Sequence, residues 1–293
     1  MKTMKKKHGE KSPTKGARII TLKELGPQLP LGVLGPDGSQ VRDIELKTWN
    51  FKAERKLSRT MENVEGTADP ATYVTYVLSE LCPSLGMIGH SSNEAKKVTP
   101  GMVRTMVESM YMGDVWYAYV WLRREAVGNE MTLTPLCKTC RKEFSFVANL
   151  DTIEVRVGDQ VEDFYWEYKM KRPFSVRGKE VETITMGPPR WSVCQKMIEN
   201  PTDASVAFET TKAGIYYLNG DHSRRAVVLD SDLDEMHKVD ITGIASASNG
   251  KHLGANMLLE ISKEEHTCSA GHRNDYTMAI DWSYQSFFAD SSK

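Results

Sequence analysis

Apolar and polar residues first alternate and then recur at helical spacing through the first half of the chain. The alternation over 41–46 predicts a strand, and the segment 51–61 that follows it predicts a helix. Apolar residues also recur at helical spacing over 70–81 and over 102–110, and a proline stands near the start of each, where its fixed φ suits the first helical turn. Strands combined with helices in this way predict an α+β fold.

A further helix is predicted over 115–126. Gly113 and Asp114 are expected to end the preceding helix and cap this one, and Gly128 is expected to stop it. Apolar and aromatic residues recur along one side, whereas Arg123 and its charged neighbours are expected to stay in water. Methionine and aromatic residues at this spacing are more often core than a binding surface, so we assign them to a core.

Two short cysteine motifs each lie between two alternating, strand-like segments. The first is Cys137-Lys138-Thr139-Cys140, and the second is Cys268-Ser269-Ala270-Gly271-His272. Each is expected at the tip of a β-hairpin, where a tight turn brings two side chains together. Residues 137–140 are called the first knuckle below, and residues 268–272 the second knuckle.

The ligand types in the knuckles predict a metal site. Thiolates and imidazole hold zinc in closed tetrahedral sites, so the two knuckles together predict one structural zinc bound by Cys137, Cys140, Cys268 and His272. Cys-x2-Cys is a common ligand spacing, whereas Cys-x3-His is looser, and His266 is an alternative fourth ligand. Unrelated thiols and a surface histidine are the competing explanation, because the knuckles lie far apart in the chain.

The two halves of the chain repeat the same succession of patterns. Each passes from a strand into helical stretches and then into a knuckle, and Gly128-Asn129-Glu130-Met131 and Gly254-Ala255-Asn256-Met257 occupy the same place in each half. Chance similarity of two ordinary β-to-α successions is the alternative. The favoured fold is α+β with two tandem, divergent α+β units, each ending in a β-hairpin knuckle, joined by a shared zinc-ribbon-like site.

This interpretation sets the expected boundaries. They are a disordered basic tail at 1–27, a first unit with the Cys-x2-Cys knuckle at 28–158, a connecting helix at 159–172 and a second unit with the Cys-x3-His knuckle at 173–290.

Composition agrees with a globular protein. The 293 residues are 40% hydrophobic, which is enough for sizeable cores, and the net charge of −1 does not favour nucleic acid or an acidic membrane as a partner. The lysine block at the start is followed by no apolar segment, so it does not predict a signal peptide; a nucleic-acid or nuclear-localisation arm is the alternative to a solvated tail. No segment is apolar for long enough to cross a bilayer.

Cysteine usage points to a reducing compartment. Five cysteines, an odd number without a secretory signal, favour metal ligation over disulfides. Cys82 and Cys194 lie in apolar helical surroundings and are expected to be core residues.

Known catalytic motifs are missing from the sequence. It contains no phosphate-binding loop, no dinucleotide fingerprint, no nucleophile elbow and no His-Glu-x-x-His, and Cys82 with His90 makes a weak nucleophile-and-base pair because no third group orients it. Asp230, Asp232 and Asp234 do not continue as a calcium loop, and they predict an acidic helix start instead. We therefore expect no enzyme activity, no catalytic residues and no small-molecule substrate.

Four segments resemble the baseplate hub assembly chaperone family of tailed bacteriophages, also described as tail assembly proteins. They are the Leu-Pro-x-Gly segment leading into a strand and a helix (31–57), the Thr-Pro to Gly-Asp helical pair (99–128), the strand-like segment 149–155 and the ending 280–288, with its aspartate before a Ser-Phe-Phe run. The resemblance covers about residues 28 to 290. Members of that family commonly carry two Cys-x2-Cys knuckles, whereas here the second is matched by Cys268 and His272 with one extra residue.

The resemblance implies a role in building the phage tail tip. The protein would be a transient assembly chaperone or a baseplate component, its partners would be other hub or tape-measure proteins, and it would lie in the host cytoplasm or in the virion tail baseplate. A nucleic-acid-binding zinc ribbon is the alternative, since Lys138, Arg141 and Lys142 are basic, but acidic residues around the second knuckle make nucleic acid an unlikely partner. A metalloenzyme would require a water-occupied zinc.

Overall fold

The computed structural model describes residues 16–34, 40–62, 70–82, 84–85, 100–193, 203–248, 251–256, 258–261, 267–273 and 276–279. Helices and five small antiparallel sheets make up this part of the chain, which confirms the α+β class. The lysine-rich segment 1–15, His90, Cys194, His266 and the ending 280–293 fall outside the described residues.

The order of elements along the chain repeats. The first unit contains β1 (Arg18–Thr21), α1 (Leu22–Leu25), β2 (Gln28–Leu34), β3 (Gln40–Glu45), α2 (Phe51–Glu62), α3 (Pro70–Leu81), β4 (Ser84–Leu85), α4 (Pro100–Ser109), α5 (Met112–Val127), β5 (Glu130–Leu133) and β6 (Phe146–Asn149). A short 3-10 helix, η1 (Leu150–Thr152), leads into the second unit.

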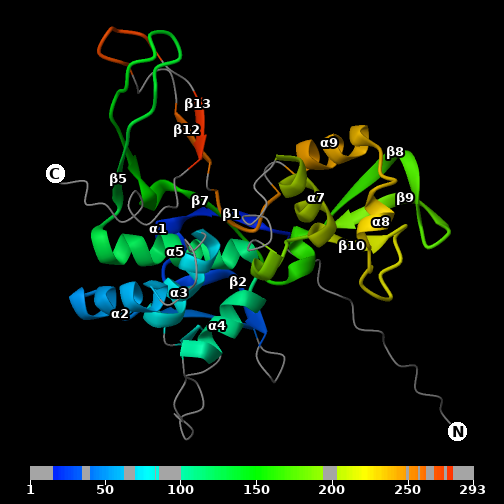
Figure 1. The fold of residues 1–293 in the computed structure, drawn as a ribbon, viewed down its shortest axis with the longest axis horizontal. Coiled ribbons are helices and arrows are strands. Elements are labelled where there is room, and N and C mark those ends of the chain that lie inside the picture. The colour runs from blue at the N-terminus through cyan, green and yellow to red at the C-terminus, as the bar shows by residue number, and fades with distance from the viewer. Residues whose placement is uncertain are drawn as a thin grey trace, which may run out of the picture.

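The second unit follows the same plan. It contains β7 (Glu154–Val157), the 3-10 helix η2 (Val161–Phe164), β8 (Trp166–Val176), β9 (Lys179–Met186), α7 (Asp203–Gly214), β10 (Ile215–Leu218), α8 (Asp230–Leu233), α9 (Lys238–Ala247), β11 (Gly254–Ala255), β12 (Leu258–Ile261) and β13 (Tyr276–Ala279). Figure 1 shows the body of the first unit beside that of the second, with the β12–β13 hairpin of the second unit lying next to β5 of the first.

Sheet topology repeats as well. In each unit a hairpin pairs its second strand with a third strand that arrives after helices, giving the orders β2-β3-β4 and β10-β9-β8. Both hairpins contain an irregularity in register, between Gln28 and Val33 in β2 and between Lys169 and Phe174 in β8.

The two units also meet through equivalent strands. β1 and β7 pair antiparallel, with Arg18 opposite Val157 and Thr21 opposite Glu154. The first residue of one strand therefore faces the last residue of the other, as in any antiparallel pair in full register. β11 extends this sheet on the other side of β7.

A buried aspartate forms the same contact in both units. Asp114 and Asp240 are each the third residue of a helix, α5 or α9, that precedes a knuckle hairpin. Asp114 accepts hydrogen bonds from the N–H groups of Leu31 and Gly32 at 2.9 and 3.2 Å. Asp240 likewise accepts from two successive N–H groups in the irregular part of β8, at 2.6 and 3.1 Å. In both units one carboxylate satisfies two N–H groups that the irregular strand leaves without a ladder partner.

The structure corrects the predicted start of the first unit. Residues 18–25, expected in a disordered tail, form β1 and α1. Thr21 and Glu24 build a capping box at the start of α1, and Leu22 is fully buried. The four-residue helix was too short to show a helical period.

The connecting helix predicted at 159–172 is also wrong. That segment contains η2 and the first part of β8, so the second unit has already begun there. Its aromatic residues suit a strand as well as a helix, and Met170, Phe174 and Val176 turn inward at every second or fourth position. Pro173, the residue directly after the expected connecting helix, lies in the irregular part of β8, where a strand tolerates proline.

Two residues of α5 also differ from expectation. Asp114 is a buried residue inside the helix, and Tyr111 holds the N-cap position. Arg123, expected in water, is fully buried, where it donates to the carbonyl of Gly128 and, at 2.6 Å, to that of Glu130. It thus satisfies carbonyls at the exit from the helix, which periodicity alone does not reveal.

The described residues form two main cores. The larger one gathers the buried faces of α3, α4 and α5 with β5 and β6 of the first unit and β7 of the second, and it encloses Trp191, whose indole N–H donates to Thr75 at 2.7 Å. The smaller one lies between the β8–β9–β10 sheet and helices α8 and α9. No helix of the described chain is long and apolar enough to span a membrane.

Candidate metal centre

The first knuckle is the tip of the β5–β6 hairpin. The N–H of Cys137 donates to the carbonyl of Lys142 at 2.8 Å, and the N–H of Arg141 donates back to the carbonyl of Cys137 at 2.9 Å. Arg141 takes a left-handed conformation with φ 60°, which closes the turn directly after the second cysteine. These bonds place the Cys137 and Cys140 side chains on one side of the turn.

The second knuckle closes a turn that is one residue shorter. Here the N–H of Cys268 donates to the carbonyl of His272 at 3.0 Å, and the N–H of Gly271 donates to the carbonyl of Cys268 at 2.8 Å. Gly271 is left-handed, with φ 79°. In the first knuckle the second ligand precedes the left-handed residue, whereas here His272 follows it. The longer reach of imidazole compensates for this different position, which accounts for the looser Cys-x3-His spacing.

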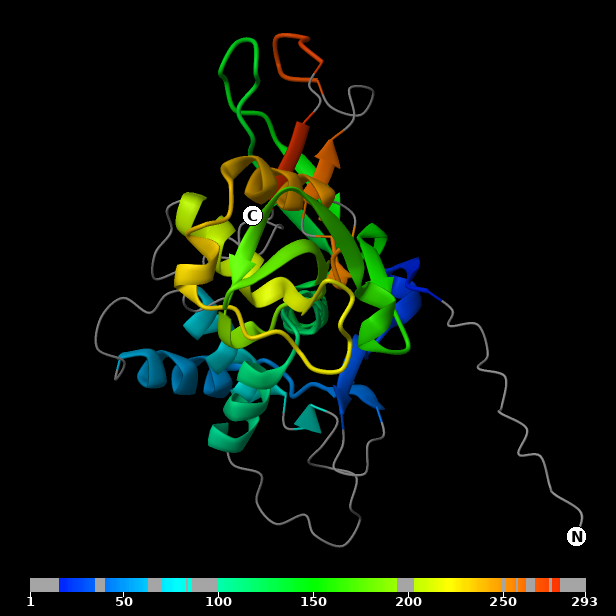
Figure 2. The same ribbon diagram turned by 90° about the vertical axis from the view of Figure 1, so that its right-hand side faces the viewer.

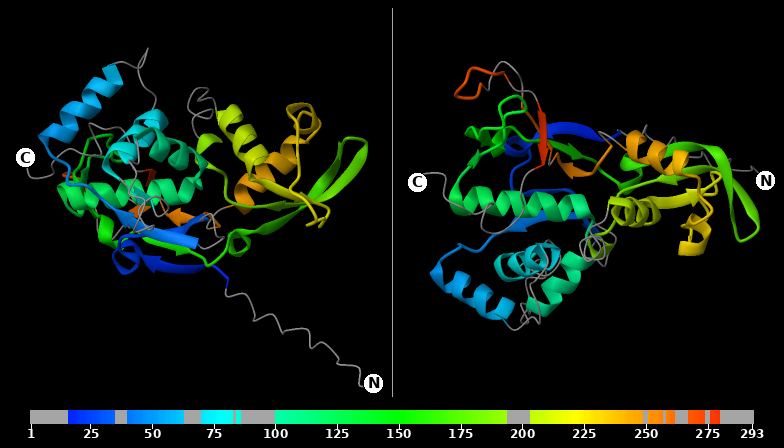
Figure 3. Two further views of the ribbon diagram at one scale, coloured as in Figure 1. Left: turned by 90° about the horizontal axis from the view of Figure 1, so that it is seen from below. Right: turned by 45° about the horizontal axis from the view of Figure 1, so that its top comes forward.

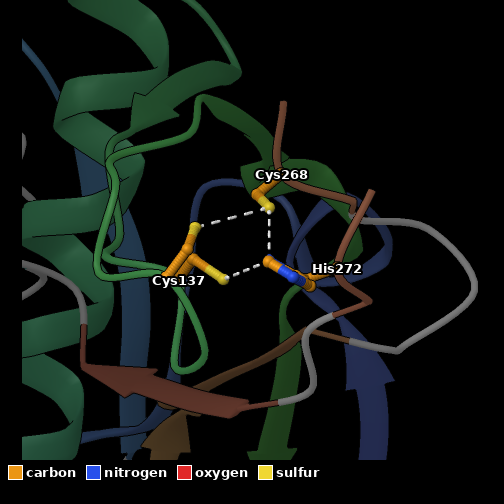
Figure 4. A group of neighbouring side chains, drawn as sticks. Cys137, Cys268 and His272 are labelled. Carbon is orange, nitrogen blue, oxygen red and sulfur yellow. Dashed lines mark hydrogen bonds between the residues drawn. The ribbon is translucent and has the colours of Figure 1, made fainter. Parts of the chain in front are cut away.

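The two knuckles bring four candidate ligand atoms together. The ligand atoms of Cys137, Cys140, Cys268 and His272 all lie within 4.8 Å of one another, although Cys140 and Cys268 are 128 positions apart. Figure 4 shows Cys137 from the first knuckle facing Cys268 and His272 from the second. Figure 2 shows the two knuckles side by side at the top of the molecule.

Distances within the cluster fit a tetrahedral ion. Zinc–sulfur bonds of about 2.3 Å at tetrahedral angles separate two sulfur atoms by about 3.8 Å, and a sulfur and a nitrogen by about 3.5 Å. The Sγ atoms of Cys140 and Cys268 are 3.8 Å apart. The Nδ1 atom of His272 lies 3.4 Å from Sγ of Cys268 and 3.8 Å from Sγ of Cys137. The donor set therefore fits one metal ion held by all four side chains.

The local environment favours a thiolate. The backbone N–H of Cys140 lowers the pKa of Cys137 to about 6, although burial acts against the charged form. Cys137 and Cys268 are buried against Phe144, while Cys140 and His272 remain partly exposed. One side of the cluster is thus covered by protein, and the other can receive an ion from solvent.

Packing between the units supports the second knuckle. Gly113, at the start of α5, lies so close to the chain before β11 that an added Cβ would be 1.9 Å from the carbonyl oxygen of Leu253. Gly254 approaches α5 equally closely, since its Cβ would be 2.3 Å from the carbonyl oxygen of Gly113. These two glycines let β11 pack against α5 of the first unit while it pairs with β7, so the chain that leads to β12 lies beside the first unit.

The structure brings together the four residues that the sequence predicted as ligands. Cys82 lies apart from them in the large core, where burial raises its pKa to about 12, as expected for a core cysteine. Sequence reasoning missed the paired roles of Asp114 and Asp240. The available signal was an acid in the first helical turn, which is too common to indicate a contact with a distant strand.

Comparison with protein families, with characterised proteins and with solved structures finds no match to the chain.

Proposed function

We propose that this protein acts without catalysis in the assembly of a bacteriophage tail, at the baseplate hub, and that a structural zinc ion ties its two units together. The observation that carries the metal part of this proposal is the convergence of two knuckles, one from each unit, on a single site with ligand atoms within 4.8 Å.

The number and kind of ligands support a structural role for the ion. Three thiolates and one imidazole fill a tetrahedral shell, so no position remains for a reacting water. The sulfur–sulfur and sulfur–nitrogen distances suit zinc. An ion in this site would link residues that lie on separate units, so its binding free energy would contribute to the stability of the joined fold.

The tail-assembly role is supported by the resemblance of the four sequence segments to baseplate hub assembly proteins. A rigid two-unit body suits a protein that holds other hub or tape-measure components, whether it leaves the tail or stays in it. Its expected location is the host cytoplasm, or the virion tail baseplate if it stays.

Quantitative mass spectrometry of purified particles and of infected-cell lysate tests this role. A fixed small number of copies per particle would make the protein a baseplate component, and its presence in lysate with assembly intermediates alone would make it an assembly chaperone. If it is found in neither particles nor complexes with tail proteins, the proposal is wrong.

Basic residues at the knuckle tips favour one second candidate, a nucleic-acid-binding zinc ribbon. Lys138, Arg141, Lys142 and Arg273 are exposed around the metal ligands. Phosphate contacts from such residues produce affinity that falls steeply with salt. Fluorescence anisotropy with a duplex oligonucleotide at low and at moderate salt decides the matter, because absence of binding at both salt concentrations removes this candidate.

A further inference from the structure

A second candidate site lies in the second unit, far along the sequence from either knuckle. It is a pocket of about 350 Å³ between the tip of the β8–β9 hairpin and the loop 219–227 that follows β10. Figure 3 shows this hairpin projecting at the end of the molecule away from α2. Nothing in the proposed metal centre accounts for the pocket.

Hydrogen bonds hold both walls of the pocket. The side-chain oxygen of Asn219 accepts hydrogen bonds from the backbone N–H groups of Glu182 and Thr183 at 2.8 and 3.2 Å. The backbone N–H of Asn219 donates to the carbonyl of Thr183 at 2.7 Å. The loop returns to the sheet where the N–H of Ala226 donates to the carbonyl of Tyr216 at 2.7 Å. On the opposite wall, Arg177 and Gly178 are both left-handed, which gives the hairpin a tight two-residue turn. Hydrogen bonds and a tight turn therefore fix the backbone of both walls of the pocket.

Positive charge dominates the pocket. Four cationic side chains line it, Arg177, Lys179, Arg224 and Arg225. One acid, Asp221, faces them, and its carboxylate is already engaged by the N–H and hydroxyl of Ser223.

The cations have few protein partners. Arg225 stacks over the ring of Tyr216, with 4.1 Å from its guanidinium carbon to the ring centroid, and donates to the carbonyl of Ala213 at 3.3 Å. Arg177, Lys179 and Arg224 form no salt bridge within 4 Å of their side-chain nitrogens among the described residues. The hydrogen bonds from Ser223 lower the pKa of Asp221, and at longer range the charges of Arg224 and Lys179 help to lower it. Because one acid faces four cations, the pocket keeps an excess of positive charge for an external anion.

The rest of the lining is apolar. Val176, Val181 and Leu218 contribute from the sheet, and Val227 is 61% exposed at the rim. Leu229, two residues further along, is 50% exposed. A bare phosphate group would leave this apolar surface uncovered, whereas a peptide that combines carboxylates with aliphatic side chains would use both the cations and the apolar wall.

We propose that this pocket docks an acidic, aliphatic segment of a protein partner. The inference rests on the proposed function only in taking the partner to be a protein of the same assembly. Carboxylates of the segment pair with the arginines at the rim, and its aliphatic side chains cover the valines.

Fluorescence anisotropy of the purified full-length protein tests the proposal. The probe is a fluorescein-labelled peptide of about ten residues that alternates glutamate with leucine, and the reference is a peptide that alternates lysine with leucine. We expect binding of the acidic peptide alone, and we expect Arg177→Glu and Arg224→Glu each to weaken it at least about tenfold. Both positions are exposed, so the fold should survive, and circular dichroism checks this.

Lys52→Glu is the matched control. It makes the same change of charge at an exposed position on α2 in the first unit, and it should leave the affinity unchanged. Equal loss in this variant would show a nonspecific charge effect and overturn the proposal.

Two further results would overturn it. One is an acidic peptide that does not bind, or that binds the Arg177→Glu and wild-type proteins equally. The other is displacement of the peptide by micromolar tripolyphosphate, which would identify a phosphate site instead. Because the assay measures neither metal nor particles, a failure here leaves the proposed function standing, and loss of zinc or of tail association leaves this result standing.

Discussion

The two units keep the same contacts in very different surroundings. In both, an aspartate in the first turn of a helix binds two N–H groups of an irregular strand, and a knuckle hairpin follows the helix. The helices between these features differ in length, and the two cores differ in size. The shared contacts hold α5 against β2 and α9 against β8. Each of these helices precedes a knuckle hairpin, so the contacts help to position the knuckles.

The aspartates themselves differ in one respect that matters for stability. Burial raises the pKa of Asp114 to about 7, against the opposing effects of the N–H groups of Leu31 and Gly32 and then of Arg42 and Arg190. Asp240 has an additional partner, because the hydroxyl of Tyr168 donates to it at 3.2 Å. The same motif is therefore costly to charge in the larger core and is supported by a third donor in the smaller one.

Loss of a metal ligand should have the largest effect on stability, and it should do so whichever unit supplies the ligand. Cys140→Ser and Cys268→Ser are each expected to release zinc and to reduce the free energy of unfolding by several kcal/mol, on the order of what metal binding supplies in small zinc domains. Thermal unfolding and elemental analysis of each purified variant measure this. Cys82→Ala is the control, because Cys82 is buried outside the cluster and its loss should destabilise the core without releasing metal.

Removal of either buried aspartate tests whether the two contacts are equivalent. Asp114→Ala and Asp240→Ala each leave two strand N–H groups without an acceptor, at a cost of about 1–3 kcal/mol per group. Urea unfolding should show a loss of stability for both variants, while Asp234→Ala, at the exposed end of α8, should cost much less. A small effect at either buried position would break the comparison.

The pH dependence of stability should show the cost of charging Asp114 in the larger core. Its folded-state pKa lies above the ordinary value of 3.8, so the stability that it permits is complete at low pH and is lost as pH rises to about 7. Between pH 6 and pH 8 the wild type should therefore lose about 1 kcal/mol relative to Asp114→Asn. Urea unfolding of both proteins at the two pH values gives this double difference, and a difference that does not change with pH would contradict the raised pKa.

The smallest expected effect is at an ion pair near the surface. Arg124 donates to Asp151 at 2.6 Å and lowers its pKa, so this pair stabilises the fold above the ordinary aspartate pKa and loses that effect in acid. Asp151→Asn should cost at most about 1 kcal/mol at neutral pH, because both side chains are partly exposed. Between pH 6 and pH 8 its difference from the wild type should stay constant, in contrast to Asp114→Asn.

Local patterns in the sequence were sufficient to predict the long helices of the first unit, the knuckle hairpins and the metal ligands, but not α7, whose residues 203–214 were expected to form a loop. Helical spacing and proline marked α3 and α4, and the cysteine spacing marked the four residues that meet in the structure. The failures have physical causes. β1 and α1 are too short to show a period, β8 contains a proline at its irregularity, and Arg123 and Asp114 are buried because they bind backbone groups distant in the sequence or beyond the helix end.

The boundary between the units illustrates the same limit. The segment 150–157 was expected to close the first unit, and β7 in this segment pairs with β1 and buries Val155 and Val157 in the large core. This pairing joins segments that are far apart in the sequence, so no local pattern encodes it.

The most direct test of a metal shared by two units is the zinc content of the purified protein and of two single variants, one from each knuckle. The account predicts one zinc per chain in the wild type and its loss in both Cys137→Ser and Cys268→Ser. A wild type without zinc, or a Cys268→Ser protein that retains a full equivalent, would contradict it.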